Sequence, residues 1–224
     1  TWNMDETLLE AAITEKTKAI MPVSIYGQCP EMDSINATAK KYELPVIEDA
    51  AQSFGATYKG KKSCNLSTIG STSFFPSKPL GCYGDGGALF TNDDELAEKF
   101  RWIRIHGQEY KHHHSILGLN GRMDTIQAAI LLEILNLFPG EVVKRGEVGE
   151  FYTSKLSSLD FLQTPKIGNN NTSVYAQYTI LSEQREDIQS NLKDNDIPSV
   201  SYYCIPLHLQ PVFAKFNYKL GDFP

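Results

Sequence analysis

Two short apolar segments separated by a helical pattern, within residues 19–49, constrain the fold more than any other part of the sequence. Residues 19–24 read Ala-Ile-Met-Pro-Val-Ser, residues 32–42 place small and apolar side chains on one helical face, and residues 44–49 end in Glu-Asp. Strand, helix and strand at this spacing are typical of a parallel sheet with crossover helices. Ligands bind beyond the carboxyl ends of such strands, so we expect Asp49 at a ligand-binding edge.

A second buried strand, predicted over residues 68–75, is followed at once by a turn that carries Lys78 between two prolines. A lysine held there is expected to be a partly desolvated amine, the state in which lysine acts as a nucleophile or forms a Schiff base. The alternative is an ordinary solvated lysine in a loop. Ser73, five residues earlier, could donate its hydroxyl to a phosphate or be an ordinary strand serine.

Asp49 and Gln52 add a second half to this candidate site. A carboxylate at a strand end can keep a ring nitrogen protonated through a charge-assisted hydrogen bond. A pyridoxal phosphate (PLP) ring needs that partner to act as an electron sink, and Gln52 could bond the phenolic oxygen of the same ring. Each residue alone could be a plain polar loop residue. Their occurrence together with Lys78 favours the PLP interpretation.

Composition excludes several other classes of protein. The 224 residues carry a formal net charge of −6, with 41% hydrophobic and 21% charged residues, as in ordinary globular proteins. No basic stripe predicts a nucleic-acid partner, and we expect no apolar stretch long enough to span a membrane. The four scattered cysteines and the absence of a signal-peptide pattern favour the cytoplasm.

Three motifs that could suggest other ligands do not fit their patterns. No Cys-x-x-Cys pair exists, and consecutive histidines at 112–114 rarely converge on one ion, so no metal site is predicted. Residues 55–61 match the start of a P-loop, but Lys62 stands where Ser or Thr is needed. The glycines at 81–87 lack the order of a dinucleotide-binding turn.

The remaining elements complete an α/β pattern. Apolar residues at three- and four-residue spacing predict a helix over 123–135, Pro139 and Gly140 should break or kink it, and helix should resume over 141–156. A domain boundary is expected near residues 140–149. The other expected helices lie at 5–13, 95–105 and 183–195, with Asn92 or Asp93 capping the helix at 95–105. The other expected strands lie at 87–91, 174–181 and 199–203, with a turn at 59–62 and a polar loop at 106–121.

Several of these motifs together resemble the DegT/DnrJ/EryC1/StrS family of sugar aminotransferases. The resemblance is carried by residues 48–56, 73–81, 84–87, 106–129 and 205–211. It implies a PLP-dependent transferase of fold type I, with a mostly parallel sheet in a large domain and a smaller α+β C-terminal domain. Residues 1–145 would be the C-terminal part of the large domain and 146–224 the small domain. By the same comparison the chain looks truncated at both ends.

The resemblance also implies a reaction. The motifs are similar to the subgroup that aminates a UDP-linked 3-keto N-acetyl hexuronic acid for surface polysaccharide (O-antigen) sugars, with glutamate as the expected amino donor. One alternative is a sugar dehydratase of the same fold that uses PLP or its amino form PMP, in which histidine replaces the lysine. Another is a non-catalytic relative that binds or responds to a nucleotide sugar.

The family's functional residues can be carried over to matching positions. Lys78 matches the catalytic lysine that forms a Schiff base with PLP. Asn120 and Arg122 match residues that reach the neighbouring subunit's site, which implies a homodimer. The expected cofactor-binding residues are Asp49, Gln52, Ser73, Lys78, Asn120 and Arg122, and the expected residues on the sugar-nucleotide side are Tyr203, His208 and Arg122.

Overall fold

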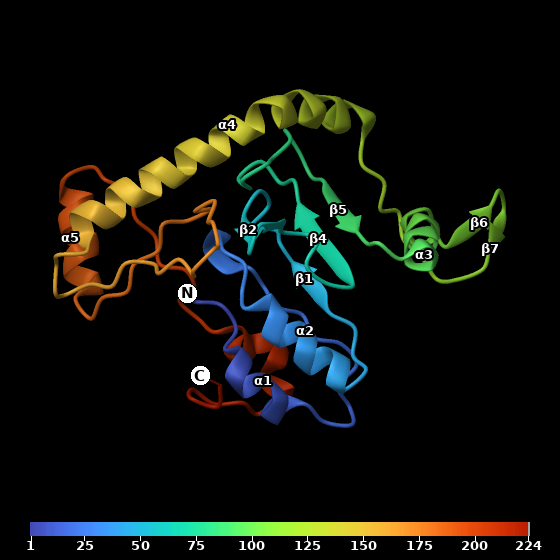
Figure 1. Ribbon diagram of the computed structural model, residues 1–224, viewed down its shortest axis with the longest axis horizontal. Coiled ribbons are helices and arrows are strands. Elements are labelled where there is room, and N and C mark those ends of the chain that lie inside the picture. Colours follow the sequence, from blue (N-terminus) through green and yellow to red (C-terminus); the bar gives the residue numbers. More distant parts are fainter. Residues whose placement is uncertain (224) are drawn as a thin grey trace. The chain divides into compact units, whose positions relative to one another are not determined.

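The structure is a computed structural model that describes residues 1–223, and its contacts divide the chain into two compact units (Figure 1). Unit 1 comprises Thr1–Ser158 and Thr164–Tyr178, and unit 2 comprises Leu159–Gln163 and Thr179–Pro224. The expected candidate cofactor residues all lie in unit 1.

A three-stranded sheet forms the centre of unit 1. Its order is β1 (Ile47–Asp49), β4 (Ile69–Ser73) and β5 (Gly87–Phe90), with β1 parallel to β4 and β4 antiparallel to β5. The parallel pair and the hairpin partner β5 confirm the predicted strands. The register places Asp49 beside Ser71 on β4.

The predicted strand at 19–24 forms only two isolated bridges. Ile20 and Val23 make isolated parallel bridges to Val46 and Asp49, without a continuous ladder between them. Pro22 interrupts this segment, and a proline has no N–H to contribute to a ladder. The segment still lies beside β1, because the Ile47 N–H donates to the Ile20 carbonyl at 2.9 Å and the Asp49 N–H to the Pro22 carbonyl at 3.0 Å.

Three helices of unit 1 agree with the sequence patterns: α1 (Glu6–Ala12), α2 (Met32–Lys41) and α3 (Asp94–Arg104). The predicted cap of α3 is Asp93, whose carboxylate accepts the Leu96 N–H at 3.0 Å. Helix α2 packs an apolar face into the main core, which consists of Ile20, Cys29, Met32, Ile35, Ala39, Val46, Ala56, Tyr58, Leu66 and Val174.

Two short hairpins occupy segments that were predicted to be turn or loop. Strands β2 (Thr57–Tyr58) and β3 (Lys61–Lys62) pair across the predicted turn. Strands β6 (Gln108–Tyr110) and β7 (His113–His114) pair inside the predicted polar loop. Two- and three-residue strands have too few residues to leave a periodic signal in the sequence.

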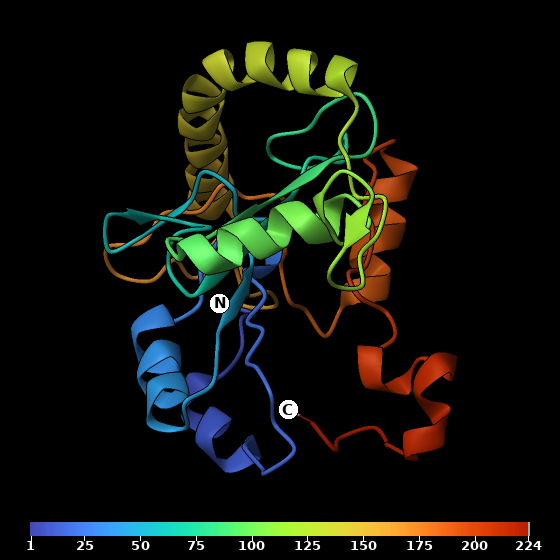
Figure 2. The same ribbon diagram turned by 90° about the vertical axis from the view of Figure 1, so that its right-hand side faces the viewer.

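Helix α4 (Thr125–Leu156) runs through Pro139 as one helix of 32 residues. The sequence predicted a break or kink at this proline, and Figure 2 shows α4 changing direction along its length. Phe138 anchors the helix, because it is 5% exposed and packs with Phe74, Leu80 and Cys82 in a second core cluster.

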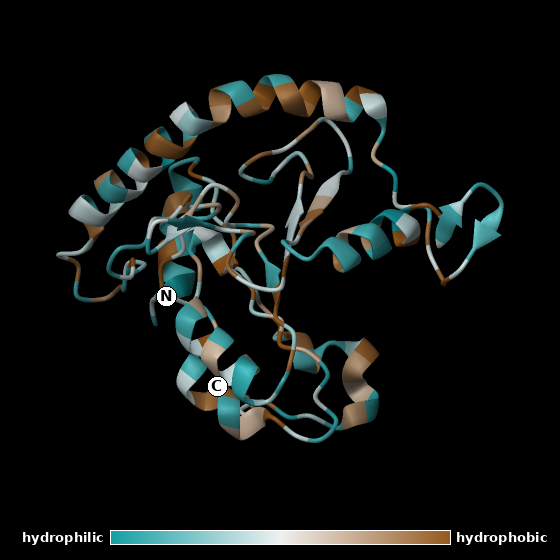
Figure 3. Ribbon diagram, turned by 45° about the vertical axis from the view of Figure 1, so that its right-hand side comes forward, coloured by the Kyte–Doolittle hydropathy of each residue, from teal (hydrophilic) through white to brown (hydrophobic). Residues whose placement is uncertain are grey.

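The length and composition of α4 correct one sequence prediction. By those two criteria alone the helix could cross a membrane, contrary to the expectation that no apolar stretch is long enough. Brown hydrophobic positions recur along it in Figure 3. It also carries Glu133 and Glu141, and Phe138 lies in the core of unit 1. That the protein has no membrane partner stays a prediction.

Unit 2 contains α5 (Arg185–Asp194) and the 3₁₀ helices η2 (Leu207–Leu209) and η3 (Pro211–Phe216). The predicted helix is confirmed, but the predicted strands at 174–181 and 199–203 are wrong. Among residues 174–203 the strand pairing is limited to a single antiparallel bridge from Leu181 to Gln163. Alternating residues form a strand only where a partner strand completes their hydrogen bonds.

Candidate active site

The polar ends of neighbouring strands meet at the carboxyl edge of the sheet in unit 1. Asp49 is the last residue of β1 and Ser73 is the last residue of β4. Asp49 lies beside Ser71, and residues two apart on a strand point to the same face. Asp49 and Ser73 therefore share one face of the sheet at one edge, as the sequence predicted for its candidate ligand site.

Asp49 and Gln52 are held by backbone donors. One carboxylate oxygen of the half-buried Asp49 accepts the Ala51 N–H at 3.0 Å. The side-chain oxygen of Gln52 accepts the Tyr26 N–H at 2.6 Å. The same side-chain amide carries an NH₂ group, which is the kind of donor that an anionic phenolic oxygen requires.

Tyr26 is a contributor that the sequence did not reveal. Its φ of 61° turns the chain directly after the segment beside β1, and this turn brings its N–H to Gln52. Positive φ is uncommon for a residue with a side chain. The signal that could have found it is the Gly27 that follows, since turns of this kind favour glycine.

Lys78 lies in a loop, residues 74–86, that is closed by backbone hydrogen bonds. The Phe74 N–H donates to the Gly86 carbonyl at 2.8 Å, and the Cys82 N–H donates to the Phe74 carbonyl at 2.8 Å. The Lys78 N–H donates to Phe75 at 2.9 Å, and its side chain is partly buried. The tight turn predicted for this lysine is therefore present.

Two further residues shape that loop. A Cβ atom on Gly81 would approach the carbonyl oxygens of Phe75 and Pro76 to 2.8 Å, so only glycine fits. The Sγ atom of the buried Cys82 lies 3.1 Å from the Phe74 carbonyl and 3.2 Å from the Gly84 carbonyl, which share its single S–H. Sequence analysis missed Cys82, because a single cysteine carries no spacing pattern.

Ser73 connects the strand to the loop. Its hydroxyl oxygen accepts the Phe75 N–H at 3.2 Å, which leaves the hydroxyl hydrogen as a donor. Because Ser73 ends β4 and Lys78 follows five residues later, one short segment that begins at the carboxyl edge carries both a hydroxyl and an amine.

Asn120 and Arg122 are held by the end of α3. Asn120 forms an antiparallel bridge with Ile105, and the Arg122 guanidinium lies 3.3 Å from the Nε2 atom of His106. The side chains of all residues from 108 to 122 except Gln108 are exposed. The contacts of this segment thus order it locally and leave it open to solvent.

Tyr203 and His208 belong to unit 2 rather than to the unit that holds the sheet. Tyr203 is 59% exposed. The His208 ring packs against Phe223 with ring centroids 4.9 Å apart and against Tyr218 at 6.3 Å. Its Nε2 atom is buried with no hydrogen-bond partner among the described residues. A role of either residue toward substrate stays a prediction.

The sequence as a whole matches a known family. The sequence model of the DegT/DnrJ/EryC1/StrS aminotransferase family matches residues 1–224. The chain belongs to this family. It is 58% identical over 224 residues to the UDP-2-acetamido-2-deoxy-3-oxo-D-glucuronate aminotransferase of Pseudomonas aeruginosa, covering 99% of this chain and 62% of that protein. The chain thus spans about three fifths of the length of this curated relative.

Solved structures of family members share the fold. DesV from S. venezuelae matches with a TM-score of 0.96 and 36% identity over 99% of this chain and 60% of its own. NtdA from Bacillus subtilis, solved with bound cofactor PMP, matches with a TM-score of 0.89 and 33% identity over 100% of this chain and 52% of its own. The family is PLP-dependent.

The residues at the carboxyl edge suit this cofactor. A pyridine ring with a phenolic oxygen, an aldehyde and a phosphate needs a carboxylate, an amide donor, an amine and hydroxyl or backbone donors. Asp49, Gln52, Lys78 and Ser73 supply one group of each kind, from two neighbouring strand ends and the loops that follow them.

Proposed function

We propose that this protein is a PLP-dependent aminotransferase that moves an amino group from glutamate to a UDP-linked 3-keto N-acetyl hexuronic acid. The observation that carries the proposal is the placement of Asp49 and Ser73 on one face at the carboxyl edge of the sheet, followed by the closed loop of Lys78. The name of the P. aeruginosa relative supports the choice of sugar. The reaction would serve surface polysaccharide synthesis in the cytoplasm.

We assign the finer fold class by the same reasoning. The chain would belong to fold type I of the PLP-dependent transferases, with residues 1–145 in the large domain and 146–224 in the small domain. The high TM-scores to family structures support the fold type. The mixed sheet with a parallel β1–β4 pair agrees with a large domain of this type.

Each residue of the site would have one task. Asp49 would keep the pyridine nitrogen protonated, Gln52 would donate to the phenolic oxygen, and Ser73 would donate to the phosphate. PLP, when bound, supplies an electron sink for the carbon that exchanges its proton. The Lys78 amine would hold the cofactor's aldehyde carbon between turnovers and then carry the proton from donor to product as base and acid.

A homodimer would complete the site. Asn120 and Arg122 would reach the cofactor or the sugar nucleotide of the neighbouring subunit, with Arg122 pairing its phosphate groups. Two observations support this arrangement: the segment that carries both residues is exposed, and helix α4, which follows it, leaves Ile126, Leu132 and Leu137 between 64% and 68% exposed. Exposed apolar surface of this kind marks interaction sites.

The proposal is tested by supplying glutamate and the UDP-linked 3-keto sugar to the PLP-loaded protein. We expect 2-oxoglutarate and an amino sugar in equal amounts. A dehydratase would release water from the sugar without lasting consumption of glutamate, and a binding protein would retain the sugar unchanged. Either of those two outcomes would refute the aminotransferase assignment.

A further inference from the structure

A buried carboxylate lies directly behind the candidate site. Glu48 precedes Asp49 on β1, and its side chain is 0% exposed. Side chains alternate along a strand, so Glu48 points to the face opposite Asp49. A fully buried glutamate is rare unless its charge is compensated. The mechanism proposed above gives this residue no task.

Glu48 binds one short segment through both of its oxygens. Its Oε1 atom accepts the Cys64 N–H at 2.9 Å and its Oε2 atom accepts the Leu66 N–H at 3.4 Å. Both carboxyl oxygens of Glu48 therefore accept a backbone N–H from this segment. We call residues 63–66 the bracket. The bracket passes so close to β4 that a Cβ atom on Gly70 would collide with the backbone of Cys64.

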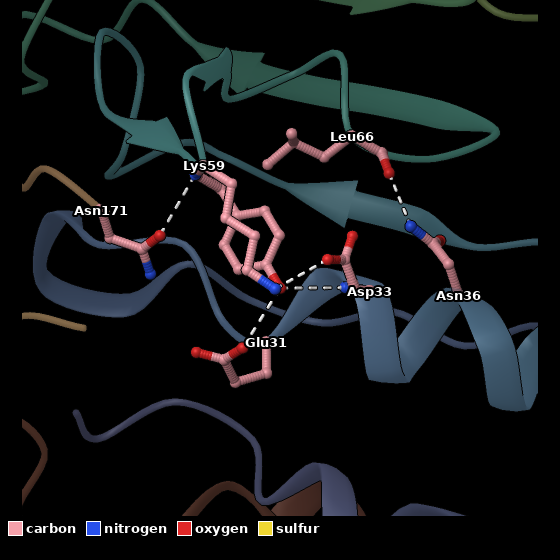
Figure 4. Close-up of polar contacts among 7 residues, drawn as sticks. Glu31, Asp33, Asn36, Lys59, Leu66 and Asn171 are labelled. Atoms are coloured by element: carbon pink, nitrogen blue, oxygen red, sulfur yellow. Dashed lines mark hydrogen bonds and ion pairs between the residues drawn. The ribbon is translucent and has the colours of Figure 1, made fainter. Parts of the chain in front are cut away.

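The bracket is tied from a second side by α2. Asn36 donates its side-chain N–H to the Leu66 carbonyl at 2.7 Å, as Figure 4 shows. The Leu66 peptide is therefore held by Glu48 at its N–H and by Asn36 at its carbonyl. At the start of α2, the Tyr58 hydroxyl donates to Glu31 at 3.1 Å and accepts the Asp33 N–H at 3.3 Å.

The bracket in turn holds the loop that carries Asp49 and Gln52. The Ser63 hydroxyl donates to the Ser53 carbonyl at 2.7 Å, and the Ser63 N–H donates to the Ala56 carbonyl at 3.0 Å. Ser53 and Ser63 are buried. A continuous set of hydrogen bonds therefore runs from the Glu48 carboxylate through the bracket to residue 53, one position beyond Gln52.

We propose that Glu48 is a positioning residue for Asp49 and Gln52, which acts by holding the bracket beneath the loop of residues 49–53. The expected effect on PLP binding and catalysis rests on the proposed function. The expected effect on the order of residues 49–53 does not. The Ala51 and Tyr26 N–H groups hold Asp49 and Gln52 within the loop, and the bracket adds a support at residue 53 through Ser63. A rigid support behind the reacting groups keeps them in productive geometry.

The test compares Glu48→Gln with Val46→Ala. Glutamine keeps the shape of the side chain, but its NH₂ group cannot accept one of the two bracket N–H groups. Val46 is the matched control, because it is 2% exposed, lies two residues before Glu48 and directly before β1, and takes part in none of these bonds. Amide hydrogen exchange of the cofactor-free protein is measured over residues 49–56, alongside the global unfolding free energy.

We expect exchange over residues 49–56 to rise about tenfold in Glu48→Gln beyond its change in Val46→Ala, since one buried donor loses its partner. PLP affinity should fall by a similar factor, and the pH midpoint of the bound cofactor's absorbance change should shift only in Glu48→Gln. Equal exchange in both variants would overturn the proposal. If the parent protein fails to bind PLP, the proposed function is refuted, while the exchange result still decides the role of Glu48.

A second variant covers the case in which Glu48→Gln does not fold. Asn36→Ala releases the Leu66 carbonyl from the α2 side and leaves Glu48 in place. Exchange should increase both in the bracket and over residues 49–53, by less than in Glu48→Gln. An increase confined to the bracket would show that the bracket does not position the loop.

Discussion

Two regions of unit 1 hold candidate binding residues in opposite ways. Around the sheet, Asp49, Gln52 and Ser73 each accept a backbone N–H. On the opposite face of β1, the buried Glu48 accepts the Cys64 N–H. Along residues 108–122, the side chains are almost all exposed, and Arg122 has an exposed histidine as its partner. The side chains of the first region are held by backbone hydrogen bonds, whereas those of the second are open to solvent.

The difference suggests a division of labour between cofactor and substrate. Groups that hold a cofactor's ring must be fixed before the reaction, and a packed sheet edge provides this. Residues that contribute to the site of a neighbouring subunit must stay exposed until the subunits assemble. The comparison therefore predicts that changes at the sheet edge act within one chain, and that changes at Asn120 or Arg122 act on the neighbouring chain.

The largest effect is expected from Lys78→Ala. Loss of the amine removes both the covalent anchor and the group that moves the proton, so turnover should fall below detection. The matched control is Lys61→Ala, which removes an exposed lysine on β3. Transamination is followed by 2-oxoglutarate formation. Activity that survives in Lys78→Ala would break the assignment of the sheet edge as the reacting centre.

The next effect concerns the charge at the end of β1. Asp49→Asn keeps an oxygen that can accept the Ala51 N–H, but it removes the negative charge opposite the ring nitrogen. We expect kcat to fall roughly 10²-fold or more, as for other buried electrostatic partners. The bound cofactor's absorbance should change as well. A variant with normal kcat would show that this carboxylate only supports the loop.

Subunit mixing tests the other region. Lys78→Ala and Arg122→Ala should each be inactive, but their equimolar mixture should recover about a quarter of the parent activity if sites are shared across a dimer. Half of the dimers would be mixed, and each of these would contain one intact site. A mixture of Asn120→Ala and Arg122→Ala is the control and should stay inactive. No recovery in the first mixture would mean that these residues serve their own chain.

A smaller effect is expected on the pH dependence of stability. Burial raises the pKa of Glu48, although the N–H groups of Cys64 and Leu66 oppose the shift, and the charge of Asp49 adds to it. A raised folded-state pKa gives a contribution that is full below the unfolded-state pKa and is lost as pH rises through the folded-state pKa. The advantage of the parent over Glu48→Gln should therefore shrink from about pH 4 upward.

Urea unfolding of both proteins across that pH range measures this difference in unfolding free energy. The parent should lose stability relative to Glu48→Gln as the Glu48 proton is released. A difference that is constant or grows with pH would contradict the burial of a titrating carboxylate behind Asp49.

The last prediction concerns which cysteines react with a thiol reagent in the folded protein. Burial raises the pKa of Cys29 and of Cys64 to about 12, and the charge of Glu48 adds to both shifts. Only the thiolate reacts, so neither should label in the folded protein, whereas the exposed Cys204 should label quickly. Peptide mapping after a short exposure to a disulfide reagent distinguishes them. Rapid labelling of Cys64 in the native protein would mean that the layer behind the sheet is open.

The sequence predicted the parts of the fold that depend on local pattern. Strand, helix and strand placed Asp49 at the sheet edge, and the proline-flanked turn predicted the loop of Lys78. The alternation of Glu48 and Asp49 could also have indicated two faces, but the sequence alone does not tell which face is buried. The bracket could not be predicted, because its bonds join segments that are distant in sequence and have no periodic signal.

The failures have a similar cause. Residues 174–181 alternate as a strand does, yet the structure gives this segment a single isolated bridge, from Leu181 to Gln163. Pairing depends on a neighbouring strand, which a local pattern does not report. Helix α4 is a different case, because the sequence predicted a break or kink at Pro139 and the helix stays unbroken but changes direction along its length (Figure 2).

Reductive trapping of the cofactor tests the central claim most directly. The purified protein is incubated with PLP, reduced with borohydride and digested, and the modified peptide is identified by mass spectrometry. We predict a single pyridoxyl group on Lys78, lost in Lys78→Ala and retained in Lys61→Ala. A folded protein that carries no label, or a label on another lysine, would contradict the account.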